Sequence, residues 1–101
     1  MKFIIKRSFR ENIYNLMRKI GYHFLKKDEE NLEYNFIRPA GSNTYPRFHL
    51  YLKIESKNLI FNLHLDQKKP IYKGATAHSG EYDGELVEKE AERIKQILEK
   101  I

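Results

Sequence analysis

The segment from residue 47 to residue 66 alternates apolar and polar side chains on both sides of a turn signal, and this pattern limits the fold most. It reads RFHLYLKIESKNLIFNLHLD. Alternation with a period of two is typical of half-buried strands, and ESKN at 55–58 separates two such runs, so we predict a β-hairpin. With the turn centred between residues 56 and 57, one face carries only apolar opposed pairs. These are Phe48 with Leu65, Leu50 with Leu63, Leu52 with Phe61, and Ile54 with Leu59.

The opposite face of this hairpin gathers polar side chains. Its predicted pairs are Arg47 with Asp66, His49 with His64, Tyr51 with Asn62, and Lys53 with Ile60. A shift of one residue would set the apolar stripe against polar side chains, so the register is well specified. Because opposed Cβ atoms lie about 5 Å apart, we expect two imidazoles, a carboxylate, a guanidinium, a phenol and an amide in one small area.

The rest of the chain predicts further strands and two helices. Residues 2–6 alternate like a short strand. Ser8 and Glu11 fit a capping box at the start of a helix over 9–20, and Gly21 follows where a left-handed carboxyl cap is expected. Strands are predicted at 22–26 and 32–38, with an acidic turn at 28–31 between them and a proline-bounded loop at 39–46 after them.

The carboxyl-terminal segment predicts an amphipathic helix that begins at Asp83 or Gly84. Its apolar stripe consists of Val87, Ala91, Ile94, Leu98 and Ile101, widened by Leu86 and Ile97. The element order is therefore strand, helix, four strands, helix. We predict a two-layer α+β domain in which two helices pack on one face of an antiparallel sheet of four to five strands.

Composition limits the class of protein. A chain of 101 residues with 41% hydrophobic content fits a single domain, 1–101. The absence of cysteine excludes disulfides, thiolate metal ligands and cysteine nucleophiles. No stretch approaches the roughly 20 apolar residues that cross a bilayer, so we expect no membrane partner and a cytoplasmic location.

The net charge of +5 favours polyanionic partners, and its distribution is uneven. Residues 1–27 hold eight lysines and arginines and one carboxylate, whereas residues 74–101 hold four basic and seven acidic residues. A polyanion is therefore expected to meet the amino-terminal region and the sheet, and to avoid the last helix.

Our first functional hypothesis is nucleic-acid binding on the open face of the sheet. Cationic side chains attract phosphates, and aromatic rings stack on bases, with Tyr34 and Phe36 as further stacking candidates. Some of the expected contacts come from the loop at 67–83, which is long for a small domain. The candidate residues are Arg47, His49, Tyr51, Lys53, Asn62, His64, Lys68, Lys69 and Lys73.

A second hypothesis is a metal-assisted or acid–base hydrolase of phosphoesters, although the composition favours a binding protein over an enzyme. Its catalytic or metal-ligating candidates are His49, His64 and Asp66, with His78 from the 67–83 loop. Imidazole and carboxylate groups suit divalent metals such as zinc or manganese, and they also suit proton transfer. The sequence contains no phosphate-binding loop, dinucleotide fingerprint or nucleophile elbow, and it requires no cofactor beyond such a metal.

A third hypothesis is a protein-interaction module, dimeric through an exposed edge or face of the sheet. Ile60 on the otherwise polar face and the aromatic residues of the 67–83 loop are compatible with it. A loop of this length is either functional or disordered, and both interpretations remain open at the level of sequence.

Overall fold

The computed structural model describes residues 1–67 and 84–101, and its elements follow the predicted order. Their bounds are β1 Lys2–Ile5, α1 Ile13–Lys19, β2 His23–Asp28, β3 Glu33–Pro39, β4 Arg47–Glu55, β5 Asn58–Asp66 and α2 Gly84–Glu99. The predicted α+β class is confirmed. Apart from Gln67, the predicted loop at 67–83 lies outside the described residues, as do Lys68, Lys69, Lys73 and His78.

The hairpin of β4 and β5 forms in the predicted register. Phe48 lies opposite Leu65, and His49 lies opposite His64. The apolar stripe is buried along its length except at Ile54, which is exposed in the last apolar pair before the turn. The alternation of core-facing and solvent-facing side chains was therefore sufficient to predict which residues of β4 and β5 pair.

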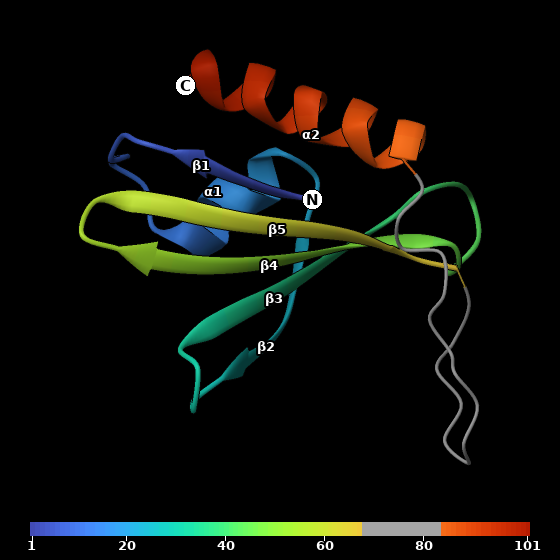
Figure 1. Ribbon diagram of the computed structural model, residues 1–101, viewed down its shortest axis with the longest axis horizontal. Coiled ribbons are helices and arrows are strands. Elements are labelled where there is room, and N and C mark those ends of the chain that lie inside the picture. The colour runs from blue at the N-terminus through green and yellow to red at the C-terminus, as the bar shows by residue number, and fades with distance from the viewer. Residues whose placement is uncertain (68–83) are drawn as a thin grey trace.

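Five strands form one antiparallel sheet in the order β1-β5-β4-β3-β2 (Figure 1). β1 pairs with β5 at one edge, where Phe3 lies opposite Phe61 and the two rings stack with centroids 5.1 Å apart. β2 forms the other edge. Both helices contribute to the core that covers the apolar face, with Leu16, Met17 and Ile20 before β2, and Val87, Ala91, Ile94 and Leu98 from α2.

The first helix is shorter than predicted. We expected it to begin after a cap at Ser8, but α1 begins at Ile13, and the side chain of Asn12 accepts the Asn15 N–H at 2.9 Å. The Glu11 carboxylate pairs with Lys19. Asparagine is among the best amino-terminal caps, so the later cap takes the place of the predicted one. Gly21 has the predicted left-handed conformation after the helix, with φ +93°.

The second helix begins at Gly84 as predicted, but its buried stripe differs. Leu86 is 47% exposed and Ile101 is also exposed, whereas Glu90 is only 5% exposed. Val87, Ala91, Ile94 and Leu98 face the core as expected. Within residues 1–67 and 84–101, no helix has the length and hydrophobicity needed to span a membrane.

Glu90 is buried because three polar side chains surround its carboxylate. Tyr22 donates its hydroxyl to Oε2 at 2.7 Å, Arg93 donates to both oxygens at 2.9 Å, and Arg38 donates to Oε1 at 3.3 Å. Arg93 also donates to the Ile20 carbonyl at 2.7 Å. Burial raises the pKa of Tyr22, and the neighbouring Glu90 charge raises it further. This cluster joins α2 to the end of α1 and to β3.

The hairpin of β2 and β3 is displaced by one or two residues from its predicted bounds, and a bulge interrupts it between Phe24 and Lys26. Tyr34 and Phe36, which we expected as stacking groups on the open face, instead pair with Leu52 and Leu50 and face the helices. Phe36 is fully buried there. Both rings are therefore removed from the open face.

Candidate functional site

The face of the sheet opposite the helices carries polar side chains from every strand. Their positions follow from the registers of the four strand pairs. They are Lys2 on β1, His23, Lys26 and Asp28 on β2, Glu33 and Asn35 on β3, Arg47, His49, Tyr51, Lys53 and Glu55 on β4, and Asn62, His64 and Asp66 on β5. All six predicted nucleic-acid contacts from β4 and β5 thus lie on one face.

His49 is the most constrained side chain of this face. It is 8% exposed, and both ring nitrogens have oxygen partners. Nδ1 lies 3.1 Å from Oδ2 of Asp66, and Nε2 lies 2.9 Å from Oδ1 of Asn35. Arg47 donates from Nε to the same Asp66 oxygen at 3.3 Å. The predicted neighbours Arg47, His49 and Asp66 therefore form one hydrogen-bonded group, which Asn35 completes from β3.

The orientation of the Asn35 amide determines what His49 can do. The Asn35 Nδ2 donates to the Glu33 carbonyl at 3.4 Å, which leaves Oδ1 as the acceptor that faces His49. An amide oxygen and a carboxylate oxygen both require N–H donors. Both ring nitrogens of His49 are thus engaged by side-chain oxygens, and abstraction of a proton from a substrate would require one of these hydrogen bonds to break.

Asp66 is the acidic partner of this group. Burial alone would raise the pKa of its carboxyl, but the hydrogen bond and charge of His49, followed by those of Arg47, lower the pKa below its ordinary value. A lowered pKa in the folded state stabilises the protein at pH values above the ordinary pKa of the carboxyl. This stability is lost as the pH falls through the folded-state pKa.

We therefore expect Asp66→Asn to lower the free energy of unfolding by about 1 kcal/mol at pH 7, since bonds to charged groups exceed neutral ones and Asp66 is partly exposed. The difference from the wild type should shrink towards zero as the pH falls through the lowered folded-state pKa of the carboxyl. Urea denaturation at a series of pH values measures it. Glu30→Gln, at an exposed turn, is the control, and an equal difference at all pH values would contradict the assignment.

Tyr51 stands at the centre of the open face between the two histidines. Its ring stacks on the His49 ring with centroids 4.2 Å apart and planes 6° from parallel, and it meets His64 edge to face at 5.3 Å. His49 is itself held by Asp66 and Asn35. The orientation of the phenol ring is therefore fixed before any ligand arrives.

Within the described part of the chain, two hollows lie on this face, and Tyr51 lines the first. One has a volume of about 400 Å³ and is bordered by Lys26, Arg47, His49 and Asp66 among others. The second has a volume of about 330 Å³, and Lys2, Ile4, Lys53, Ile60 and Asn62 line it together with Glu33 and Glu55. Both combine charged, amide and apolar groups, and in neither do the cations outnumber the carboxylates.

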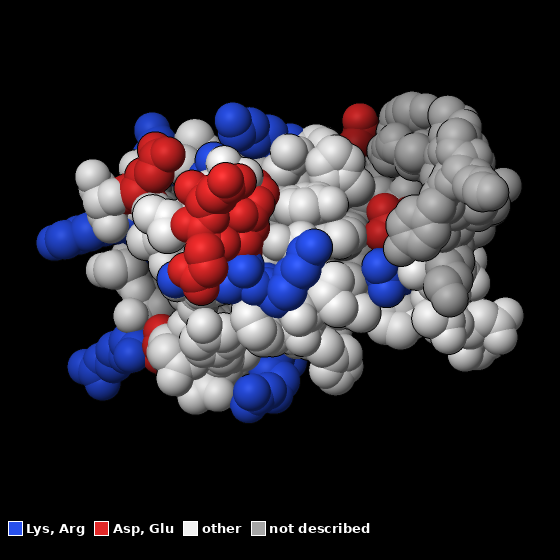
Figure 2. Space-filling model, turned by 90° about the horizontal axis from the view of Figure 1, so that it is seen from below, with Lys and Arg blue, Asp and Glu red and all other residues white. Residues whose placement is uncertain are grey.

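The charge of the open face is nearly balanced, in contrast to the chain as a whole. Its cations are Lys2, Lys26, Arg47 and Lys53, and its carboxylates are Asp28, Glu33, Glu55 and Asp66. Figure 2 shows acidic side chains gathered over the β2–β3 turn, where Glu29 and Glu30 adjoin Asp28 and Glu33. Among residues 1–67 and 84–101, the excess positive charge lies elsewhere, so the described side chains of this face do not attract phosphate by charge alone.

The predicted metal site is not assembled within the described part of the chain. His49, His64 and Asp66 share the open face, but no group of three His, Asp or Glu side chains in residues 1–67 and 84–101 is arranged to hold a metal ion. One oxygen of Asp66 accepts from both Arg47 and His49. His78, the fourth candidate, lies outside the described residues.

Asn35 is the member of the site that the sequence did not indicate. No register between β3 and β4 was predicted, so no pattern placed residue 35 opposite Tyr51 and beside His49. A usable signal existed in the alternation of buried and polar positions along β3. Asn35 precedes Phe36, which pairs with the buried Leu50, and it must therefore face the other side.

Comparison with models of protein families, with curated proteins and with solved structures gives no match for this chain. The function is therefore argued from the geometry of the site.

Proposed function

We propose that the chain binds single-stranded nucleic acid across the open face of β4 and β5. The observation that carries this proposal is the fixed Tyr51 ring, which is stacked on His49 and in edge contact with His64. Aromatic side chains on a sheet face are a recurrent platform for unpaired bases, and each base–aromatic stack contributes about 1–3 kcal/mol. A ring that is already ordered loses little further entropy when a base stacks on it.

The cations around the platform supply a small number of phosphate contacts. Lys2 and Lys53 line one hollow, and Arg47 lines the other. Each neutralised phosphate contributes about −0.7 to the slope of log K against log salt for a single strand. With two or three contacts, we expect a slope of roughly −2, which is shallow for a basic protein. Stacking, rather than charge, then supplies most of the affinity.

A single strand suits this face better than a duplex. The acidic turn between β2 and β3 carries Glu29 and Glu30 at one corner, and they would repel the closely spaced phosphates of a duplex. A flexible strand can follow β4 and β5 and leave that corner unoccupied. Unpaired bases also expose the faces that stack on aromatic side chains such as Tyr51. Such a ligand is compatible with the cytoplasmic location that the sequence predicts.

The hydrolase hypothesis receives less support from the geometry. A general base needs a lone pair directed at the substrate, and both nitrogens of His49 are occupied by Asn35 and Asp66. The structure thus favours a binding role for His49, in which the imidazole supports the Tyr51 ring.

Fluorescence anisotropy with short labelled DNA and RNA strands tests the proposal, because Tyr51→Leu removes the stacking ring. We expect this variant to weaken single-strand binding by about 5- to 150-fold, the equivalent of one stacking contact. Tyr51→Phe keeps the ring and should retain most of the affinity. A duplex of the same length should bind more weakly than the single strand at every salt concentration.

The charge contribution is measured separately with Lys53→Ala, which should make the salt slope shallower by about 0.7. Lys100→Ala removes the same charge from the exposed end of α2 and should leave both affinity and slope unchanged. No binding of any single strand at low salt, or equal affinity for the wild type and Tyr51→Leu, would refute the proposal.

A further inference from the structure

The outer edge of β1 has backbone groups available for pairing. Met1 and Leu63 exchange hydrogen bonds, with Leu63 N–H to Met1 O at 2.7 Å and Met1 N to Leu63 O at 2.9 Å. Such pairs alternate along an antiparallel ladder, so Phe3 and Ile5 also bond to β5. The backbone N–H and C=O of Lys2 and Ile4 therefore point outwards. Within the described part of the chain, β5 is the one strand that pairs with β1.

The two edges of the sheet differ in how they oppose pairing. β2 carries a bulge between Phe24 and Lys26, and two consecutive lysines, features that natural proteins use to prevent a further strand from joining. β1 pairs without a bulge over its whole length, and Ile4 is 48% exposed beside this edge. β1 is short and carries Lys2, features that also oppose pairing, but its regular ladder makes its edge the better suited of the two to an additional strand.

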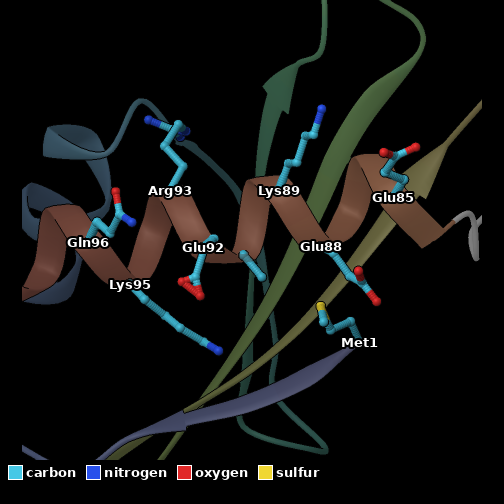
Figure 3. Close-up of a pocket in the computed structure, with 9 residues that line it drawn as sticks. Met1, Glu85, Glu88, Lys89, Glu92, Arg93, Lys95 and Gln96 are labelled. Atoms are coloured by element: carbon cyan, nitrogen blue, oxygen red, sulfur yellow. The ribbon is translucent and has the colours of Figure 1, made fainter.

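A groove adjoins this edge. It has a volume of about 670 Å³, and Met1 and α2 line it, with Ala91 from the buried face of the helix. Figure 3 shows Glu88, Glu92 and Lys95 pointing from α2 towards the side on which Met1 and β1 lie. The groove thus offers apolar surface together with both signs of charge.

We propose that a second copy of this chain pairs with the β1 edge, antiparallel and around a two-fold axis, so that two sheets join into one. A two-fold contact must be self-complementary, because each residue meets its partner twice. The outward backbone groups of Lys2 and Ile4 must meet the same groups of the second copy. This leaves a small set of registers that can be compared directly.

The charges on β1 select one of these registers. A two-fold axis through Lys2 places Lys2 of one copy opposite Lys2 of the other. An axis through Ile4 places Lys2 of each copy opposite Lys6 of the other. Both registers are disfavoured, because like charges in direct opposition are destabilising. An axis through Phe3 places Lys2 of each copy opposite Ile4 of the other copy, so no like charges are opposed. It also brings the two Phe3 side chains together on the helix side, where aromatic pairs stabilise a sheet. Phe3 is therefore the expected centre.

The helix charges fit the same axis. β1 and α2 run in the same direction (Figure 1), so an antiparallel pair of β1 strands also makes the two α2 helices antiparallel. Lys95 lies over the Phe3 ring at 5.2 Å and is thus close to the axis, with Glu92 one turn nearer the amino terminus of α2. In the dimer, each Lys95 approaches Lys95 of the other copy near the axis, and the Glu92 carboxylates on both sides offset this repulsion.

Sedimentation velocity at protein concentrations spanning about two orders of magnitude tests the dimer, without nucleic acid, so its result is independent of the proposed function. We expect a concentration-dependent species of twice the monomer mass. Ile4→Pro removes one outward N–H and no bond to β5, so the monomer should keep its circular dichroism while its dimer dissociation constant rises at least about tenfold. Ile4→Val keeps the N–H and is the control.

Reversal of the Glu92 and Lys95 charges tests the proposed contact between the two α2 helices. Glu92→Lys and Lys95→Glu should each weaken the dimer, and the double variant, which exchanges the two signs, should recover most of the affinity. A wild type that stays monomeric at every concentration overturns the proposal. So does a dimer that Ile4→Pro leaves unchanged, because its interface must then lie elsewhere.

Discussion

Replacement of Glu90 by alanine is expected to lower the free energy of unfolding by about 3 kcal/mol. The Glu90 carboxylate accepts from the Tyr22 hydroxyl and from the guanidinium groups of Arg38 and Arg93. Removal of the shared acceptor leaves two positive charges close together and a buried hydroxyl without its partner. The contacts between α2 and the segment around Tyr22 are lost in the same step.

The size of this effect depends on how well the remaining groups can hydrate. A fully buried ion pair that loses one member costs about 3–5 kcal/mol. The side chains of Arg38 and Arg93 are 31% and 32% exposed, so water can reach both guanidinium groups after the substitution. The Tyr22 hydroxyl lies deeper, in a side chain that is 1% exposed. We therefore expect a value near the lower end of that range.

Urea denaturation at neutral pH measures the effect. Glu90→Gln retains acceptor and donor atoms but removes the charge, and it should fall between the wild type and Glu90→Ala. Glu99→Ala removes an exposed carboxylate from the same helix and should change stability by less than about 0.5 kcal/mol. If Glu90→Ala matched Glu99→Ala, the cluster would have no role in stability.

The sequence was sufficient to predict those elements in which apolar side chains alternate along a strand, or recur at helical spacing, and so form one buried face. The β4–β5 register followed from four apolar pairs, and the polar face opposite needed no further information. The position of β1 beside β5 did not follow in this way, because a strand of four residues with one buried phenylalanine could join either edge. Contacts between distant segments determine that choice, and alternation within one strand does not describe them.

Glu90 and Asn35 show why the polar interior could not be predicted. Each is buried because specific partners surround it, namely Tyr22, Arg38 and Arg93 for Glu90, and His49 for Asn35. A hydrophobic pattern assigns such residues to the surface, since charged and amide side chains are rarely buried without partners. In α2, the apolar pattern predicted that Leu86 is buried. Leu86 is exposed, and Glu90, about one turn later, is buried instead.

The candidate site was predicted in its residues but not in its charge. The sequence placed Arg47, His49, Tyr51 and Asp66 together, and the structure confirms that placement. Two of the four carboxylates on the open face, Asp28 and Glu33, come from β2 and β3, for which no register was predicted, so the balance of charge emerged only from the folded sheet. The net charge is a property of the whole chain, whereas a ligand contacts only one face of the folded protein.

Replacement of Phe61 by alanine is expected to lower the free energy of unfolding by about 4 kcal/mol, the largest effect of any substitution considered for this chain. Phe61 is fully buried, stacks on Phe3, and lies opposite Leu52 in the central hairpin. The truncation removes a ring from a close-packed core and leaves a cavity that the strands on either side cannot close. Thermal and urea denaturation both measure this loss.

The neighbouring residue provides a matched control that also tests the face assignment. Ile60 precedes Phe61 on β5 but lies on the open face, where it is only half-buried. Ile60→Ala should therefore cost about 1 kcal/mol, because its methyl groups leave a partly hydrated surface and no closed cavity forms. A register shifted by one residue would reverse the two positions. If Ile60→Ala proved more damaging than Phe61→Ala, the hairpin register and the site built on it would both be wrong.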